Sequence, residues 1–243
     1  MDLRQEFADR VAAAEQELPG PELLPERLAR ACWEVLPVDG AGLSAFFSQE
    51  RRLPLGASDP VSSTAERLQF SVGEGPCLTA HSTGQPVVAD ETELYAHWPG
   101  FADALTQHTP IRGIISLPLH GVLEDIGALD LYVQAPRDIR GVGFADVLIV
   151  VSELTAALAR ALNGDRDDDG PGWLDAPPVG RRAQVWQAVG MVNVGLELTS
   201  PDALALLRAY AYGHDDDLDG VADDLVQRRL SLDDVAMSTG ADR

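Results

Sequence analysis

The sequence has 243 residues, 45% of them hydrophobic, which suffices for two ordinary domains with real cores and excludes a disordered chain. Its charge is lopsided: 39 acidic residues stand against 18 basic ones, the net charge is −21, and lysine is absent, so each of the 18 is an arginine. General electrostatic attraction to nucleic acid is therefore excluded, since phosphate binding depends on Lys and Arg, and any RNA contact must be local. A coding bias towards G and C and the acidic surface of a halophile both fit this composition.

The two cysteines, Cys32 and Cys77, are far apart in the sequence, and we expect no disulfide between them. The N-terminal segment predicts a charged helix and lacks the apolar centre of a secretory signal. No apolar run is long enough to span a bilayer. We therefore expect a reduced, cytoplasmic protein whose partners include neither a membrane nor DNA.

Helix and strand signals are mixed along the first two thirds of the chain. Residues 1–20 predict a helical extension, with the helix over 2–18, and residues 22–36 predict a second helix. Strands over 41–47 and 53–57 are expected to form a hairpin, and a helix begins at Asp59-Pro60 and ends at Arg67. The remaining predicted elements are a strand end at 70–72, a helix that ends near 83, a strand over 85–90, a helix from 98 that ends before Pro110, strands over 112–120 and 126–133, and a long helix over 144–162.

This mixture predicts an α+β unit and not regular βαβ repeats. Four segments, in this order and spacing, resemble the GAF family: Gly73-Glu74-Gly75-Pro76-Cys77, Trp98-Pro99-x-Phe101, residues 115–119 and residues 126–132. The resemblance covers residues 21–162. It implies a central antiparallel sheet with flanking helices, in a domain that holds a small ligand or mediates dimerisation.

The stretch Gly73-Glu74-Gly75-Pro76-Cys77 has two interpretations. In the first, a loop and a helix N-terminus offer backbone N–H groups to a ligand, and the helix dipole favours a Cys77 thiolate. In the second, the glycines supply the positive φ angles of a tight turn, and Cys77 is a small buried apolar residue.

Apolar residues near one predicted end of the sheet are the candidates for a ligand pocket. Trp98 and Phe101 are expected to cover that end, where the pocket of a GAF domain usually lies. The full candidate set is Leu43, Phe46, Cys77, Trp98, Phe101, Ile115 and Leu117. The alternative is that these side chains simply fill the space and leave a scaffold without a ligand.

Nothing in the sequence predicts catalysis. The five histidines, at positions 81, 97, 108, 120 and 214, lack metal-ligand spacing and have no cysteine pair nearby. No nucleophile elbow or phosphate-binding loop occurs, and Asp125 and Asp130 fall in a hairpin and a strand instead of a paired acid–base site. We therefore expect a protein that is not an enzyme and that uses neither a metal nor another cofactor.

The helix over 144–162 has more apolar surface than one sheet can cover. Leu148, Val151 and Leu154 share one face, while Ile149 and Val150 leave apolar surface on another. With the helix over 22–36, it could form a four-helix seam between two copies of the chain. We therefore expect a homodimer.

Residues 163–178 combine glycine, proline and a run of aspartates, which is typical of an exposed linker that repels itself. A second domain over 179–230 follows, and residues 231–243 are expected to form a tail. The second domain predicts three short helices with breaks at Thr199-Ser200-Pro201-Asp202 and around 213–217. Its apolar stripes are Val185, Ala188, Val189 and Val192, then Leu204, Leu207 and Ala211, then Leu218, Val221, Ala222, Leu225 and Val226.

The same segment resembles the ANTAR domain, a three-helix RNA-binding module of bacterial transcription antiterminators. Residues 187–191, 203–212 and 221–226 carry the resemblance. It implies a regulator that binds an RNA with two small hairpin loops and prevents a terminator from forming. RNA loops are recognised through aromatic stacking and arginine contacts, so the candidate residues are Arg181, Arg182, Arg208, Tyr210, Tyr212, His214, Arg228 and Arg229.

The charge of this domain argues for an alternative function. Residues 181–230 contain five arginines and eight acidic residues, a net charge of −3, and acidic residues 215–217 stand where the family usually has basic or polar ones. Like charges repel phosphate. The bundle could instead serve as a protein-docking or dimerisation module without RNA binding, with Tyr210 and Tyr212 in the core or at an interface.

Overall fold

The computed structural model describes residues 2–46, 52–120, 123, 127–164, 177–214 and 216–238. The chain divides into two compact units, residues 1–176 and 177–243. This division falls within the segment predicted as a linker, of which residues 165–176 lie outside the described residues. Among the described helices, none combines the length and the apolar character that a membrane span requires.

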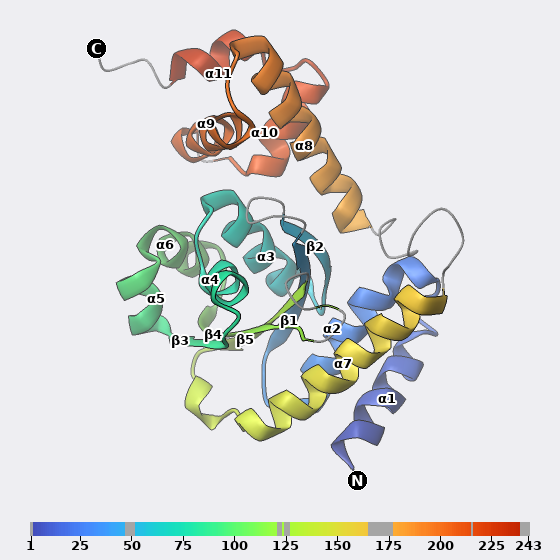
Figure 1. The fold of residues 1–243 in the computed structure, drawn as a ribbon. Coiled ribbons are helices and arrows are strands. Elements are labelled where there is room, and N and C mark those ends of the chain that lie inside the picture. Colours follow the sequence, from blue (N-terminus) through green and yellow to red (C-terminus); the bar gives the residue numbers. More distant parts are fainter. Residues whose placement is uncertain are drawn as a thin grey trace. The chain divides into compact units, whose positions relative to one another are not determined.

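Unit 1 is built on a five-stranded sheet in the order β2-β1-β5-β4-β3 (Figure 1). All neighbouring strands are antiparallel, and β1 and β2 form the predicted hairpin. The α+β class with an antiparallel sheet is therefore confirmed for this unit. The strands are β1 (Gly40–Phe46), β2 (Arg52–Ala57), β3 (Val87–Asp90), β4 (Ile111–Pro118) and β5 (Gly127–Gln134).

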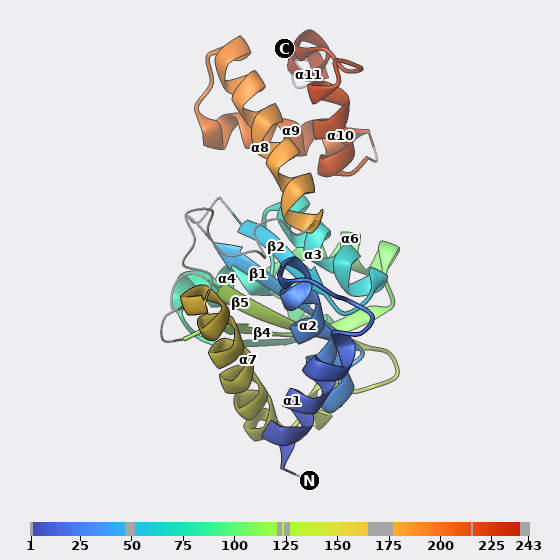
Figure 2. The ribbon, with the colours of Figure 1, turned by 90° about the vertical axis from the view of Figure 1, so that its right-hand side faces the viewer.

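Helices cover both faces of this sheet. One face carries α1 (Leu3–Ala14), α2 (Leu24–Val35) and α7 (Phe144–Gly164), and the other carries α3 (Pro60–Val72), α4 (Pro76–Thr83) and α6 (Pro99–His108) (Figures 1 and 2). Between β3 and α6 lies α5 (Glu91–His97), which begins with a capping box formed by Asp90 and Glu93. Short 3₁₀ helices lie at Pro21–Leu23 and Ile139–Gly141.

Two glycines of the hairpin identify which helix packs on which face. A Cβ atom at Gly42 would lie 2.1 Å from the Glu66 carboxylate of α3, whereas one at Gly56 would lie 2.5 Å from the backbone nitrogen of Glu26 in α2. Gly56 pairs with Leu43 across the hairpin. Because successive strand residues point to opposite faces, even-numbered β1 residues face α3 and odd-numbered ones face α2.

The strand end predicted at 70–72 is wrong, because these residues form the last turns of α3. The buried positions of α3 follow helical spacing, but Glu66 and Gln69 are among them, so the stripe is not apolar enough to be recognised. Asp59 caps the helix by accepting hydrogen bonds from two backbone nitrogens, and Gly73 ends it with φ = 83°.

The regular elements in the described part of unit 2 are helices: α8 (Pro177–Leu196), α9 (Ser200–Gly213), α10 (Leu218–Val226) and α11 (Leu232–Ser238). The three predicted stripes are buried except for Val226, which is half-buried. Thr199 and Asp217 cap α9 and α10. The fourth helix, α11, lies in the segment predicted as a tail, and it packs on α8 and α9 with Val235 buried.

We predict that Gly56→Ala destabilises the protein by about 1–3 kcal/mol, because the added methyl group meets the backbone of α2, which cannot turn aside as a side chain would. Gly141→Ala is the control, since its Cβ would meet no atom within 4 Å, and it should change stability by no more than about 0.5 kcal/mol. Urea unfolding followed by circular dichroism measures both. Equal stabilities of the two variants would contradict the close packing of α2 on β2.

Candidate functional site

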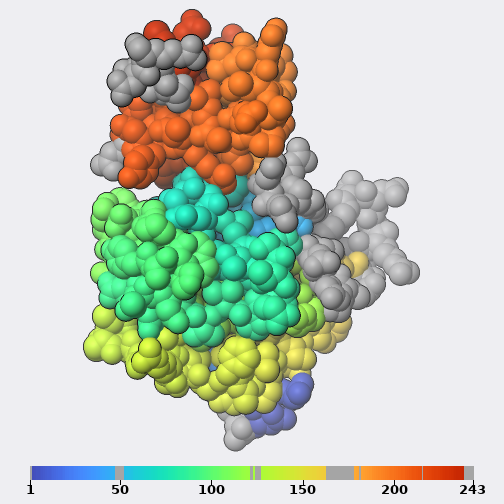
Figure 3. Space-filling model, turned by 60° about the vertical axis from the view of Figure 1, so that its left-hand side comes forward, coloured from blue at the N-terminus to red at the C-terminus, as the bar shows by residue number. Residues whose placement is uncertain are grey.

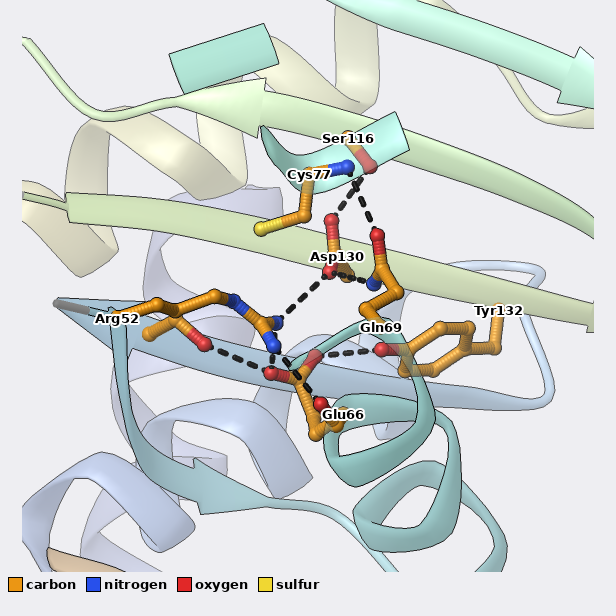
Figure 4. A network of polar contacts seen from close by, with 8 residues as sticks. Arg52, Glu66, Gln69, Cys77, Ser116, Asp130 and Tyr132 are labelled. Carbon is orange, nitrogen blue, oxygen red and sulfur yellow. Dashed lines mark hydrogen bonds and ion pairs between the residues drawn. The ribbon is translucent and has the colours of Figure 1, made fainter. Parts of the chain in front are cut away.

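A cluster of polar side chains lies between the sheet and α3, sealed from solvent (Figure 4). Its centre consists of Arg52 on β2, Glu66 on α3 and Asp130 on β5, whose side chains are at most 2% exposed. Residues of α4, α5 and α6, teal to green in Figure 3, form the outer surface on this side of unit 1. The cluster is therefore part of the interior and not of a surface cleft.

The Arg52 guanidinium bridges the two carboxylates. Its Nη2 atom forms an ion pair with Glu66 Oε2 and lies 3.5 Å from Asp130 Oδ2, while Nη1 donates to the Glu66 carbonyl oxygen at 2.8 Å. One cation thus connects the edge strand β2 with α3 and with the middle strand β5.

Neutral donors complete the hydrogen bonding of both carboxylates. The donors are Tyr132 to Glu66 Oε1 (2.5 Å), Ser44 to Glu66 Oε2 (2.7 Å), Ser116 to Asp130 Oδ1 (2.5 Å) and Gln69 to Asp130 Oδ2 (2.8 Å). The Gln69 side-chain oxygen also accepts from the Cys77 backbone nitrogen at 3.0 Å, which extends the network into α4. Every strand of the sheet except β3 contributes a side chain to this arrangement.

Burial sets the protonation of the cluster. Burial, and after it the charge of Glu66, raise the pKa of Asp130 to about 7. Burial also raises the pKa of the Tyr132 hydroxyl, which stays neutral. Burial lowers the pKa of Arg52, but the surrounding acidic groups outweigh it and the net direction is upwards, so the guanidinium stays charged.

The glycines around Glu74 form the predicted tight turn between α3 and α4. Gly73 has φ = 83° and Gly75 has φ = 144°. Cys77 is fully buried, burial raises the pKa of its thiol well above its usual range, and its backbone N–H is already bound to Gln69. The thiolate interpretation is therefore wrong, because the low-dielectric surroundings disfavour the charged form more than the helix dipole favours it.

The predicted pocket residues do not line one cavity. Leu43, Ile115 and Leu117 belong to the register positions that face α2, opposite the polar cluster. Strand alternation thus places these three on the opposite face of the sheet from Phe46 and Cys77. The remaining four pack in two separate groups: Phe46 and Cys77 with Ala128, and Trp98 and Phe101 around Leu94 and Leu105.

A pocket of about 320 Å³ does exist beside α4, and Trp98 is the one predicted residue that lines it. Its other lining residues are Gly73, Glu74, Gly75, Leu78, Thr79, His81 and Ser82. Its walls are tied together: Trp98 Nε1 donates to Thr79 at 3.2 Å, and the Glu74 carboxylate accepts from the Phe101 backbone nitrogen at 3.0 Å. The His81 ring, at the pocket, stacks on Phe46 with ring centroids 3.8 Å apart.

The sequence patterns do not predict the polar cluster. They place Asp130 in a strand and give no partner for it, and they do not single out Arg52 or Glu66. One signal was present, because Asp130 is the sole charged residue between Gly127 and Gln134 in a strand that is otherwise apolar. A charge in such a position needs a buried partner.

The RNA-binding candidates of unit 2 are distributed over different environments. Arg182 is buried and forms an ion pair with Asp219 at 3.3 Å, so its placement on an RNA-binding surface is wrong: the acid of α10 draws it into the bundle. Arg229 is exposed but forms ion pairs with Asp223 and Asp224. The side chain of Arg181 lies outside the described part of the chain.

The other candidates lie on α9 and just after α10. The Tyr210 ring stacks on His214 with centroids 4.0 Å apart, and Tyr212 is 85% exposed. Arg208 is half-buried on the same helix, and Arg228 is exposed with φ = 60°.

No protein-family model matches the chain, and no curated protein matches it in sequence. Among solved structures, the GAF domain of an Acinetobacter phosphoenolpyruvate-protein phosphotransferase is 11% identical (TM-score 0.46, covering 69% of this chain and 99% of that one). The corresponding GAF domain from Coxiella burnetii is 16% identical, with a TM-score of 0.43, and the match covers 66% of this chain and 97% of that one. A phycocyanobilin-bound GAF domain of a cyanobacterial phytochrome is 12% identical, with a TM-score of 0.47, and the match covers 68% of this chain and 98% of that one. With TM-scores below 0.5, these likenesses do not establish the family of this chain.

We predict that Arg52→Met destabilises the protein by about 3–5 kcal/mol, because it leaves two buried carboxylates without their cation. The control is Arg140→Met, which removes an exposed ion pair with Asp90 and should leave the free energy of unfolding almost unchanged. Urea unfolding of both variants at neutral pH makes the comparison. Similar losses in the two would show that the cluster contributes no more than a surface pair.

Proposed function

We propose that this chain is a cytoplasmic regulatory protein without catalytic activity. In this proposal unit 1 is a GAF-type sensory and dimerising domain, and unit 2 is an ANTAR-type output domain that binds RNA in transcription antitermination. The motifs that carry the two resemblances support it. They fall on the turn between α3 and α4, on the start of α6, on β4 and β5, and on α8 to α10. The pocket beside α4 would receive a small ligand as the signal.

The RNA-binding part of the proposal rests on one face of α9. Arg208 and Tyr212 are four residues apart and therefore lie on the same side of the helix. An aromatic ring that is 85% exposed gains nothing for the fold, but it offers an unpaired base a surface for stacking. Arginine on the same face would supply the contact to phosphate.

A second candidate function, protein docking by unit 2, is supported by the state of the arginines. Arg182 and Arg229 are both engaged by aspartates of unit 2 itself. With eight acids against five arginines over residues 181–230, the field around the bundle repels phosphate. In this function Tyr212 would contact a partner protein.

We predict that the folded protein binds an RNA carrying two small hairpin loops with micromolar or tighter affinity at low salt, and that salt weakens the complex. Tyr212→Ala should weaken binding by roughly tenfold, as expected for the loss of one stacked base. Val194→Ala, at a side chain that is 79% exposed on α8, is the matched control and should bind like the wild type. Electrophoretic titration measures all three proteins.

Absence of binding by the folded wild type at low salt would contradict RNA recognition and favour the docking function. Equal weakening by Tyr212→Ala and Val194→Ala would leave RNA binding standing but remove α9 as its surface.

The dimerising part of the proposal rests on α7, where Phe144 and Leu148 are exposed large apolar residues one helical turn apart. We predict that light scattering at micromolar concentration gives twice the mass of one chain, and that Leu148→Asp gives the mass of one chain. Val88→Asp, on the edge strand β3, changes an equally exposed apolar residue (45% against 47%) and should remain a dimer. A monomeric wild type would contradict this part of the proposal.

A further inference from the structure

The polar cluster of unit 1 contains more acid than base. One guanidinium, Arg52, faces two carboxylates, and all three are sealed from solvent. An uncompensated charge in the interior is costly, and two carboxylates that share one site cannot both stay ionised without that cost. The excess of one negative charge is therefore the feature of this interior that requires an explanation.

Among the residues that the structure describes, Arg52 is the one cation that faces Asp130. The charged and titratable groups that face it come from each element around it: Arg52 from β2, Glu66 from α3, Cys77 from α4 and Tyr132 from β5. Ser116 and Gln69 are its neutral hydrogen-bond partners. Apart from Arg52, each of these titratable neighbours is neutral or negative, so a proton on Asp130 is what can neutralise the excess negative charge.

We propose that Asp130 is a proton-binding site whose occupancy controls how firmly α3 and α4 are held on the sheet. The proposal does not rest on the regulatory function given above, because it concerns unit 1 alone.

The hydrogen bonds around Asp130 suit both protonation states. A proton taken from solvent binds Oδ1, and the resulting O–H donates to the Ser116 oxygen, 2.5 Å away. The hydroxyl of Ser116 can accept as well as donate, so this contact persists when its direction is reversed. Oδ2 carries no proton in either state and keeps its contacts with Gln69 and Arg52.

Loss of the proton acts across the interface between helix and sheet. The ionised Asp130 on β5 then repels Glu66 on α3 in a medium of low dielectric constant. The Gln69 side chain donates to Asp130 through its nitrogen and accepts from the first turn of α4 through its oxygen. A change in the charge of Asp130 is therefore transmitted to α4 through Gln69. Since α4 supplies half of the lining of the 320 Å³ pocket, the proton is coupled to that pocket.

The sign of the effect follows from linkage. Burial and the charge of Glu66 raise the pKa of Asp130 to about 7 in the folded protein, above the ordinary value of 3.8 that holds in the unfolded chain. The folded state therefore binds more protons than the unfolded state between these values. Stability is greatest below this window, falls as the pH rises through it, and is constant above about pH 7 as far as this group is concerned.

The test compares urea unfolding of the full chain between pH 5 and pH 8 for the wild type, Asp130→Asn and Asp103→Asn. The amide at position 130 keeps the shape of the protonated acid and is neutral at each pH. Relative to this variant, the wild type should lose roughly tenfold in its folding equilibrium constant per pH unit between pH 5 and 7. Asp103 is exposed on α6, and Asp103→Asn should retain the wild-type slope.

Carboxyl-carbon NMR of the wild type keeps the proposal testable if Asp130→Asn fails to fold. In the folded protein the carboxyl-carbon resonance of Asp130 should titrate near pH 7, whereas no aspartate of the unfolded protein should titrate there. Amide hydrogen exchange in α3 and α4, corrected for its intrinsic pH dependence, should be faster at pH 8 than at pH 6. Titration of every aspartate near pH 4, or a wild-type slope that survives in Asp130→Asn, would overturn the proposal. Neither readout involves RNA, so RNA binding and proton binding can fail separately.

Discussion

The interaction on which unit 1 depends is the position of Arg52 between Glu66 and Asp130. Ions buried in this way are favourable only when their partners are close and their remaining lone pairs are satisfied. The surrounding hydroxyl and amide groups meet that condition for the two carboxylates. As a result, the attachment of α3 is directional: an apolar interface tolerates sliding, whereas these hydrogen bonds fix both the distance and the rotation of the helix on the sheet.

Sequence patterns were sufficient wherever the buried face of an element is apolar. The stripes of α8, α9 and α10 and the strands β4 and β5 were predicted within a few residues, because burial and hydrophobicity coincide there. They failed at the end of α3, whose buried stripe contains Glu66 and Gln69. The site could not be assembled for a related reason: periodicity says that Leu43 and Phe46 are buried, but not that they point to opposite faces.

Unit 2 shows how composition can mislead about charge. The residue count suggests that every acid of the unit would repel an RNA phosphate, but three of these acids form ion pairs with arginines of the same unit. Asp219 neutralises Arg182 in the interior, and Asp223 and Asp224 hold Arg229 at the end of α10. Arginines of unit 2 therefore neutralise part of its acidic charge, while exposed acids such as Asp202 and Asp216 remain on its surface.

The packing of Glu66 against Gly42 restricts which residues can occupy these two positions. A side chain at position 42 would occupy the same space as the Glu66 carboxylate, because a Cβ atom at Gly42 would lie 2.1 Å from that carboxylate. Homologous chains should therefore change the two positions together: a residue larger than glycine at 42 requires a shorter one at 66, and Arg52 then loses its nearest anion. The absence of a side chain at position 42 thus gives the Glu66 carboxylate the space in which it meets Arg52.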